Sequence, residues 1–250
     1  MKILVFGASG MTGSAIFREL SAVTELQMMG ILRSSNDRNY FSINQQNKLF
    51  ADINVEKLDV LVQIFNRIKS SIVVYWLGLT KHHKEAEDAL IAISLNALLP
   101  HRMADLCALT RLRIIYISND CVFFGSKGNY IETDITDATD LYGRSKLWGV
   151  VCYFHAITLL TSMIGHELQS KYGLLEWFFS QKGSCKGFSR SIFSGLPNIE
   201  FAPIVRDLVI PRPDLQGLSH VGAAPIDKYE LLKLMEKSYG KKIHIFKEDQ

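Results

Sequence analysis

Cysteine is scarce in this 250-residue sequence, which contains only four. Cys107, Cys121, Cys152 and Cys185 lie far apart, and none has the Cys-x-x-Cys spacing of zinc and redox sites. The seven histidines likewise show no His-x-x-x-His or comparable ligand spacing, so we expect no metal site. Isolated thiols of this kind suit the reducing cytoplasm.

Long apolar runs and blocks of like charge are also missing. The longest apolar run, residues 149–165, is interrupted by His155 and falls short of the roughly 20 residues that span a membrane. The N-terminus enters an apolar segment directly, without the charged region and cleavage site of a signal peptide. Since the net charge of +3 is spread along the chain, we expect a cytoplasmic protein without a nucleic-acid or membrane partner.

Short apolar runs alternate with helical patterns in the first two thirds of the chain. The runs cover residues 3–6, 26–32, 72–77, 112–117 and 157–161. Apolar runs without alternation are typical of strands buried on both faces of a parallel sheet. The amphipathic stretches 60–69 and 84–109 between them have lengths that suit crossover helices. This order predicts an α/β fold, a Rossmann-type doubly wound parallel sheet.

The regular pattern fades after about Ser162. Gly and Pro become frequent between residues 183 and 225, which indicates loops rather than another strand–helix unit, and one further helix is expected at 227–239. We therefore expect an NAD(P)-binding Rossmann domain at residues 1–163. Residues 164–250 would then form a small, loop-rich C-terminal substrate lobe.

A glycine-rich turn follows the first predicted strand. Gly7, Gly10 and Gly13 stand between that strand and a segment of helical character, with Ser9, Met11 and Thr12 among them. One glycine allows a tight turn, one lets the backbone approach a pyrophosphate, and one lets the helix pack closely on the strand. Glycines also end strands in ordinary turns, but this position between strand and helix favours an anion site at the helix N-terminus.

The end of the second predicted strand indicates which dinucleotide is preferred. NAD sites carry a carboxylate about 20 residues after the turn, whereas this chain has Arg33 and Ser34, with Arg38 nearby. A planar guanidinium suits a 2′-phosphate, so NADP(H) is expected and NAD(H) is the weaker alternative. Asp52, Ile53 and Gly78 complete the set of expected cofactor contacts, together with the glycine turn.

Tyr142 and Lys146 form a Tyr-x-x-x-Lys pair after the predicted strand at 112–117. A spacing of four places both side chains on one face of a helix. A neighbouring ammonium favours the phenolate and would lower the tyrosine pKa from its ordinary value near 10, which makes proton transfer feasible at neutral pH. Such pairs also occur by chance on amphipathic helices, so the motif depends on its context.

Taken together, these motifs resemble extended short-chain dehydrogenases/reductases, and within them the dTDP-4-dehydrorhamnose reductase family of nucleotide-sugar reductases. The similarity is most specific in four segments, at residues 117–123, 128–134, 137–146 and 192–197. It implies NADPH-dependent reduction of the 4-keto group of a nucleotide-linked 4-keto-6-deoxy sugar. Tyr142 would protonate the oxyanion, Lys146 would hold the nicotinamide ribose, and Asn96 would support a proton relay. For Asn96, a helix-kink or capping role is the structural alternative.

The chain departs from this family in three places. Where relatives read Ser-Thr-Asp, this chain reads Ser118-Asn119-Asp120, so an amide stands in place of the hydroxyl that binds the ketone. Strand alternation would point the adjacent Ser118 to the other face. Tyr75 and Trp76 replace a small or polar pair and are expected to narrow the site. Relatives continue for a further helical segment beyond this C-terminus, so a truncated lobe is one interpretation.

Two other functions therefore stay open. Some relatives are non-catalytic NADP-binding regulatory subunits of other enzymes, and the substitution at Asn119 is compatible with that role. A nucleotide-sugar epimerase or dehydratase is the other alternative, although Arg33 is unlike the acidic ribose ligand typical of those enzymes. Many relatives pair through helices beside the catalytic strand, so a homodimer is also an expectation.

Overall fold

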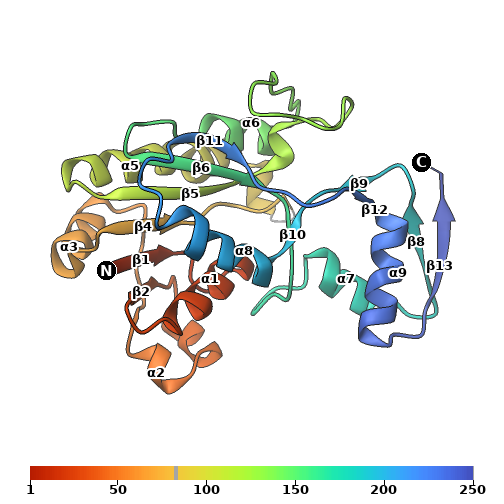
Figure 1. Cartoon of the computed structure of the whole chain (residues 1–250), viewed down its shortest axis with the longest axis horizontal. Coiled ribbons are helices and arrows are strands. Elements are labelled where there is room, and N and C mark those ends of the chain that lie inside the picture. The colour runs from red at the N-terminus through yellow and green to blue at the C-terminus, as the bar shows by residue number, and fades with distance from the viewer. Residues whose placement is uncertain (82–83, 250) are drawn as a thin grey trace.

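The computed structural model describes residues 1–81 and 84–249. Its centre is a parallel sheet of seven strands in the order β11-β6-β5-β4-β1-β2-β3 (Figure 1). The strands are β1 (Lys2–Phe6), β2 (Gln27–Ile31), β3 (Leu49–Phe50), β4 (Ile72–Tyr75), β5 (Arg113–Asn119), β6 (Ala156–Thr161) and β11 (Gly217–His220). The order reverses direction at β1, which is the doubly wound arrangement, so the predicted fold class is confirmed.

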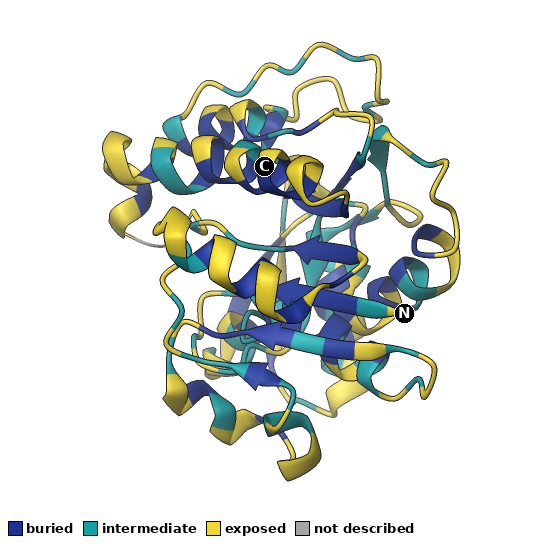
Figure 2. Ribbon diagram, turned by 90° about the vertical axis from the view of Figure 1, so that its left-hand side faces the viewer, coloured by how far each residue is buried: buried dark blue, intermediate teal, exposed yellow. Residues whose placement is uncertain are grey.

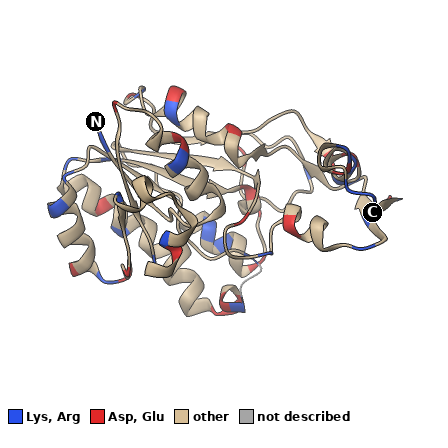
Figure 3. Ribbon diagram, turned by 90° about the horizontal axis from the view of Figure 1, so that it is seen from below, with Lys and Arg blue, Asp and Glu red and all other residues tan. Residues whose placement is uncertain are grey.

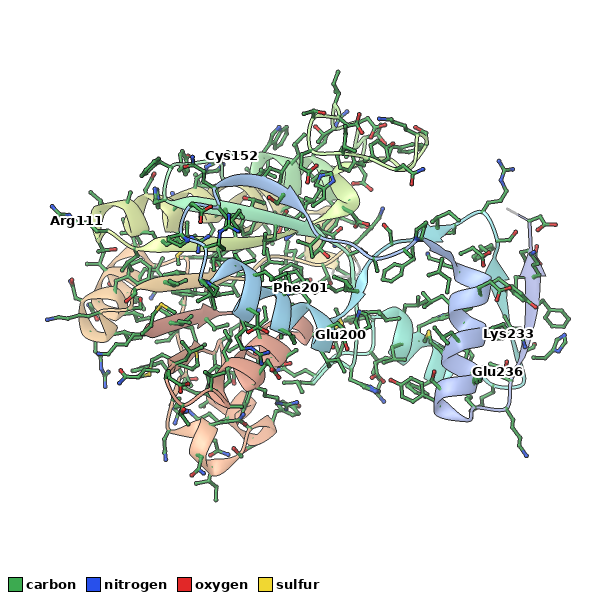
Figure 4. The ribbon with its side chains drawn as sticks, viewed as in Figure 1. Arg111, Cys152, Glu200, Phe201, Lys233 and Glu236 are labelled. Atoms are coloured by element: carbon green, nitrogen blue, oxygen red, sulfur yellow. The ribbon has the colours of Figure 1, made fainter. Side chains whose placement is uncertain are left out.

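Helices cover both faces of this sheet, as the apolar strands require (Figure 2). Helices α1 (Met11–Ser21) and α8 (Asn198–Ile204), continued by the π-helical turn η5 (Val205–Val209), lie on one face. Helices α3 (Leu58–Ile68) and α5 (Leu99–Leu109) pack on the other. Phe17 of α1 and Phe201 of α8 are fully buried, and Figure 4 labels Phe201 on its helix.

The predicted helix at 84–109 is divided into four pieces. They are η2 (Lys84–Glu87), α4 (Ala89–Ala92), the π-helical turn η3 (Ile93–Leu98) and α5. Pro100 has no N–H to donate to the carbonyl of Asn96 four residues earlier. The helix is π-helical at that carbonyl, and π-turns are frequent at functional sites.

The C-terminal part contains more regular structure than the sequence indicated. Strands β8 (Ser184–Phe188) and β13 (His244–Glu248) form a parallel pair, on which α7 (Leu174–Ser180) and α9 (Lys228–Tyr239) pack around a separate apolar core. Two short pairs connect this lobe to the main sheet: β7 (Met163–Ile164) with β10 (Leu196–Pro197), and β9 (Ile192–Phe193) with β12 (Ile226–Asp227).

Helix α8 and strand β11 are among the elements that the sequence did not predict, and they are the two that belong to the main sheet and its covering layer. Both lie in the segment assigned to the C-terminal lobe, yet β11 pairs with β6 and α8 packs against α1. Strand β11 reads Gly-Leu-Ser-His and is only half-buried, because it is an edge strand, so it lacks the continuous apolar run that marked the others. The domain boundary after residue 163 stays a prediction.

The remaining helical pieces are short and lie near the carboxyl ends of the strands. They are η1 (Ser35–Tyr40), α2 (Ile43–Gln46), η4 (Asp120–Val122) and α6 (Leu141–Trp148). Charges of both signs are interspersed over the molecule (Figure 3). Of all these elements, α6 matters most for function, because it carries both Tyr142 and Lys146.

Candidate active site

The glycine turn has the geometry that the sequence predicted for it. Gly7 has a φ of +81°, a region that favours glycine, and a Cβ atom there would clash with the carbonyl oxygen of Trp76. A Cβ atom on Gly13 would clash with the carbonyl of Gly7, so this glycine lets α1 begin directly against the turn. Gly10 is less crowded, with the nearest atom 3.3 Å from a Cβ placed there. Because α1 starts at Met11, its free N–H groups form an anion-binding end beside Gly10.

Ser9 and Thr12 complete this turn. Ser9 is half-buried, whereas Thr12 is fully buried and its hydroxyl lies 3.2 Å from the sulfur of Met163. Thr12 therefore fixes the start of α1 to β7, the first strand after the main sheet.

The residues expected at the adenosine end follow β2 and β3, at the same edge of the sheet. Arg33 is exposed, while Ser34 caps η1 by accepting a hydrogen bond from Asn36 N at 3.3 Å. Asp52 has a φ of +61° and accepts from Ser35 N at 2.9 Å, which ties the two segments together. The Ile53 N–H donates to Leu32 O at 3.2 Å. Arg33 thus has the exposed guanidinium that the sequence analysis required.

Arg38, the second candidate for a 2′-phosphate, is directed elsewhere. Its Nη2 donates to the backbone oxygen of Leu49 at 2.9 Å, so the side chain covers the edge of β3. Of the two arginines, Arg33 is therefore the one that is exposed to solvent.

A cavity of about 320 Å³ lies at the carboxyl ends of β4, β5 and β6. It collects residues that are far apart in the sequence. Among the predicted site residues, its lining includes Met11, Gly78, Asn119, Tyr142 and Lys146. In doubly wound sheets, ligands bind at this edge of the strands.

Helix α6 presents Tyr142 and Lys146 to this cavity. Asp140 begins the helix by accepting from Gly143 N at 2.7 Å, and its other oxygen pairs with Lys81 at 2.8 Å. Lys146 Nζ lies 5.9 Å from the centre of the Tyr142 ring. The spacing of four thus places both groups at one site, as the motif predicted.

The predicted lowering of the Tyr142 pKa is wrong for this structure. Burial raises the pKa of Tyr142 above its ordinary value, and the nearby Cys121 adds to this effect. Burial also lowers the pKa of Lys146 to about 8, because the ammonium loses hydration. A pair spacing read from the sequence does not include the cost of burial, which dominates for both groups here. Tyr142 is consequently a neutral phenol at pH 7, the form that can donate a proton.

Asn96 lies behind the cavity and is fully buried. Its Oδ1 accepts from Leu79 N at 2.9 Å and its Nδ2 donates to Ser145 Oγ at 3.1 Å. A Cβ atom on Gly78 would collide with Lys146 Nζ and lie 2.6 Å from Asn96 Oδ1. Asn96 therefore connects the segment after β4 to α6, which makes it a positioning residue for the Tyr–Lys helix.

Asn119 and Ser118 point in different directions. Asn119 lines the cavity, and its Oδ1 caps η4 by accepting from Cys121 N at 2.8 Å, which leaves Nδ2 as the donor of this side chain. Ser118 is fully buried and lies outside the cavity lining, because β5 continues through Asn119 and the alternation is kept. Asn119 is thus the donor at the end of this strand.

Most of the residues that line the cavity were not singled out as site residues from the sequence. Lys81 and Cys121 stand next to predicted motifs, and proximity to Gly78 and Asn119 is the signal that could have found them. Glu167 and Tyr172 come from the loop before α7, which carries no motif. Glu167 accepts from Ser170 Oγ and from Gly173 N, both at 2.8 Å, so its carboxylate fixes the fold of this loop.

The lowered pKa of Lys146 leads to a testable pH dependence of stability. Between about pH 8 and 10.5 the unfolded lysine binds more protons than the folded one, so the free energy of unfolding rises with pH in that window. We expect Lys146→Met to be more stable than the wild type below pH 8, by about 2–3 kcal/mol. The difference should shrink towards pH 10.5.

Urea denaturation of both proteins from pH 7 to 10 measures this difference. Comparing them at each pH cancels the opposite contribution of Tyr142, whose raised pKa lowers stability at high pH. A pH-independent difference would show that Lys146 keeps an ordinary pKa.

The parallel seven-stranded sheet, the glycine turn and the Tyr–Lys cavity define a Rossmann-type α/β protein with a candidate site at the carboxyl edge of its sheet. A family model described as the RmlD substrate binding domain matches residues 1–152. The chain belongs to this family, which confirms the resemblance seen in its motifs. No curated protein sequence matches the chain.

Several solved structures have the same fold. A dTDP-4-dehydrorhamnose reductase from Clostridium acetobutylicum is 18% identical, with 100% of this chain and 84% of that chain covered and a TM-score of 0.81. A dTDP-4-dehydrorhamnose reductase from Bacillus anthracis, in complex with NADP, is 17% identical, with 100% and 84% covered and a TM-score of 0.80. WbmG from Bordetella bronchiseptica, in complex with NAD and UDP, is 17% identical, with 98% and 82% covered and a TM-score of 0.75.

In residues 1–81 and 84–249, no group of three or more His, Cys, Asp or Glu is arranged to hold a metal ion. The same part of the chain has no helix that is long and apolar enough to cross a membrane. His82 and His83 lie outside the described residues.

Proposed function

We propose that this protein is an NADPH-dependent reductase that acts on the 4-keto group of a nucleotide-linked 4-keto-6-deoxy sugar. The observation that carries this proposal is the meeting of Asn119, Tyr142 and Lys146 in one cavity beside the glycine turn. Membership of the RmlD family and similarity to dTDP-4-dehydrorhamnose reductases support the substrate class. The UDP bound by WbmG supports a nucleotide as part of the substrate.

The residues present fit a nicotinamide dinucleotide at both of its ends. Gly10 leaves room for a phosphate at the N-terminus of α1, and Arg33 offers a guanidinium to a 2′-phosphate. At the other end, Lys146 would hold the nicotinamide ribose. The NADP and NAD complexes of the similar structures support this class of cofactor, which supplies a hydride when it is bound in its reduced form.

The chain's own groups would supply the proton and the orientation of the ketone. Asn119 Nδ2 would donate a hydrogen bond to the carbonyl oxygen, and the neutral phenol of Tyr142 would donate the proton that this oxygen gains. Asn96 would hold α6 in place through Ser145. A substrate that fills the cavity would displace water from it, and this would strengthen the hydrogen bonds of Asn119 and Tyr142 to the ketone.

Oxidation of NADPH in the presence of a panel of nucleotide-linked 4-keto sugars tests the proposal. We expect turnover with at least one 4-keto-6-deoxy sugar nucleotide and none with the free sugars. Binding of NADPH without turnover on any member of the panel would instead favour a regulatory subunit.

The regulatory-subunit alternative has a specific observation in its favour. Asn119 uses its oxygen to cap η4 and offers an amide where relatives carry a hydroxyl. An amide is longer than a hydroxyl and directs its hydrogen differently, so the ketone would sit in another position. Isolation of a partner enzyme whose activity rises when it binds the NADP-loaded protein would support the regulatory-subunit alternative.

Arg33 provides a test of cofactor preference. We expect Arg33→Asp to weaken NADPH binding about tenfold or more and to improve NADH binding, because a charge-assisted bond to the 2′-phosphate is replaced by repulsion. Calorimetric titration of both cofactors measures the change. Arg111→Asp, which alters an exposed arginine after α5 (labelled in Figure 4), is the matched control. Equal wild-type affinities for the two cofactors would refute the role of Arg33.

A homodimer through the helices beside β5 stays a prediction. Apolar side chains on and after α4 and α6 support it: Leu90 is 83% exposed and Phe154 is 89% exposed. Sedimentation of the wild type and of Leu90→Asp would show whether this surface pairs.

A further inference from the structure

Trp76 lies at the junction of the glycine turn and the cavity. It follows β4 directly, and its backbone N–H donates to Phe6 O at 3.2 Å, which continues the pairing of β4 with β1. Tyr75 points into the core on the α3 and α5 side, so alternation directs Trp76 to the side of α1 and α8. Of the two bulky residues noted in the sequence, only Trp76 faces the candidate site.

Trp76 borders both parts of that site. It lines the cavity together with Met11, Tyr142 and Lys146. On the other side, a Cβ atom placed on Gly10 would lie 3.8 Å from the indole Cδ1, which is ordinary van der Waals contact. Trp76 therefore lies beside the glycine turn and borders the cavity that holds the Tyr–Lys pair.

The cavity is bordered by Trp76 but does not reach the glycines of the turn. Its lining includes Met11 but none of the three glycines of the turn, and neither Arg33 nor Asp52 takes part. A dinucleotide that contacts the turn with its pyrophosphate and Lys146 with its ribose would have to pass the position of Trp76. Trp76 is half-buried, so it is partly exposed to solvent while it packs against the core on the α1 side.

We propose that Trp76 controls access of the nicotinamide half of the cofactor to the cavity. The adenosine half binds to the turn and Arg33 without hindrance, whereas the nicotinamide half enters only when the indole has moved aside. This inference rests on the proposed nicotinamide cofactor. Only molecules in which the indole is displaced can bind the whole dinucleotide. The apparent affinity for NADPH is therefore lower in proportion to the small fraction of such molecules.

Cofactor binding by Trp76→Ala tests this inference. If the displaced arrangement is populated about one time in ten, the substitution should tighten NADPH binding about tenfold. Adenosine 2′,5′-bisphosphate, which carries only the adenosine half, should bind wild type and variant within about twofold of each other. Trp177→Ala, in α7 and outside the cavity lining, is the matched control and should change neither affinity.

A second measurement does not depend on the stability of that variant. The chain has three tryptophans, so Trp148→Phe with Trp177→Phe leaves Trp76 as the only indole. NADPH should quench and shift its emission, whereas adenosine 2′,5′-bisphosphate should leave the emission unchanged. Trp76→Phe, which keeps an aromatic ring in the core, should show an intermediate gain in NADPH affinity.

The possible failures can be told apart. NADPH affinity that is unchanged or weaker in Trp76→Ala, with the bisphosphate still bound, would overturn the access role and leave the proposed function standing. Absence of binding of both ligands to folded wild type and variant would overturn the nicotinamide cofactor itself, and the inference with it.

Discussion

Tyr142→Phe is expected to reduce turnover by about 10²–10⁴-fold, the range that a positioned proton donor contributes. The phenol is buried in the cavity and neutral at pH 7, so removal of its hydroxyl removes the proton while the ring keeps its packing. NADPH affinity should remain within about twofold of the wild type, since Arg33 and the glycine turn are untouched. Steady-state oxidation of NADPH and equilibrium titration measure the two quantities.

The exposed Tyr40 in η1 provides the matched control for this experiment. Tyr40→Phe loses the same hydroxyl at a position outside the cavity lining and should keep full activity. If Tyr142→Phe also retained full activity, the proton would come from another group, and the role assigned to Tyr142 would be wrong.

Asn119→Thr is expected to raise turnover tenfold or more, because a hydrogen bond to a developing oxyanion contributes about 2.7–4 kcal/mol at comparable sites. Threonine can also accept the hydrogen bond from Cys121 N that now begins η4, so the local fold should be retained. The substitution therefore changes mainly the position of the donor, and a misplacement near 1 Å can cost about a hundredfold. The kcat of both proteins on the same sugar nucleotide measures the effect.

Asn119→Ala distinguishes two explanations that would remain if Asn119→Thr did not raise turnover. A fast wild type, a slow Ala variant and no gain with Thr would show that the amide already serves as the donor. Inactivity of all three proteins with intact NADPH binding would contradict the reductase proposal and favour the regulatory subunit.

The parts of the site that depend on local sequence could be predicted. Gly7 and Gly13 are needed because a side chain at either position would clash with backbone, and that need is visible as spacing between strand and helix. Tyr142 and Lys146 share a helix face for a similarly local reason. For the two glycines and for the Tyr–Lys pair, the spacing along the chain is enough to place the residues relative to each other.

The parts that depend on tertiary packing could not be predicted. The pKa values of Lys146 and Tyr142 are set by burial among segments that are distant in the sequence. The predicted lowering of the Tyr142 pKa was wrong because burial raises it. Strand β11 was missed because an edge strand needs no apolar run. Glu167 reaches the cavity through a loop whose path no local pattern encodes.

The return of α8 and β11 to the main sheet has a consequence for the part of the chain that matches the family. Residues 1–152 contain the turn and the Tyr–Lys pair, but the apolar surface of α1 is covered by Phe201, and Arg113 of β5 donates to Val209 O at 2.7 Å and to Leu215 O at 3.1 Å. A fragment ending at residue 152 would expose this surface and leave the guanidinium without these acceptors. Residues 1–152, which match the family model, thus depend for their solubility on the residues that follow them.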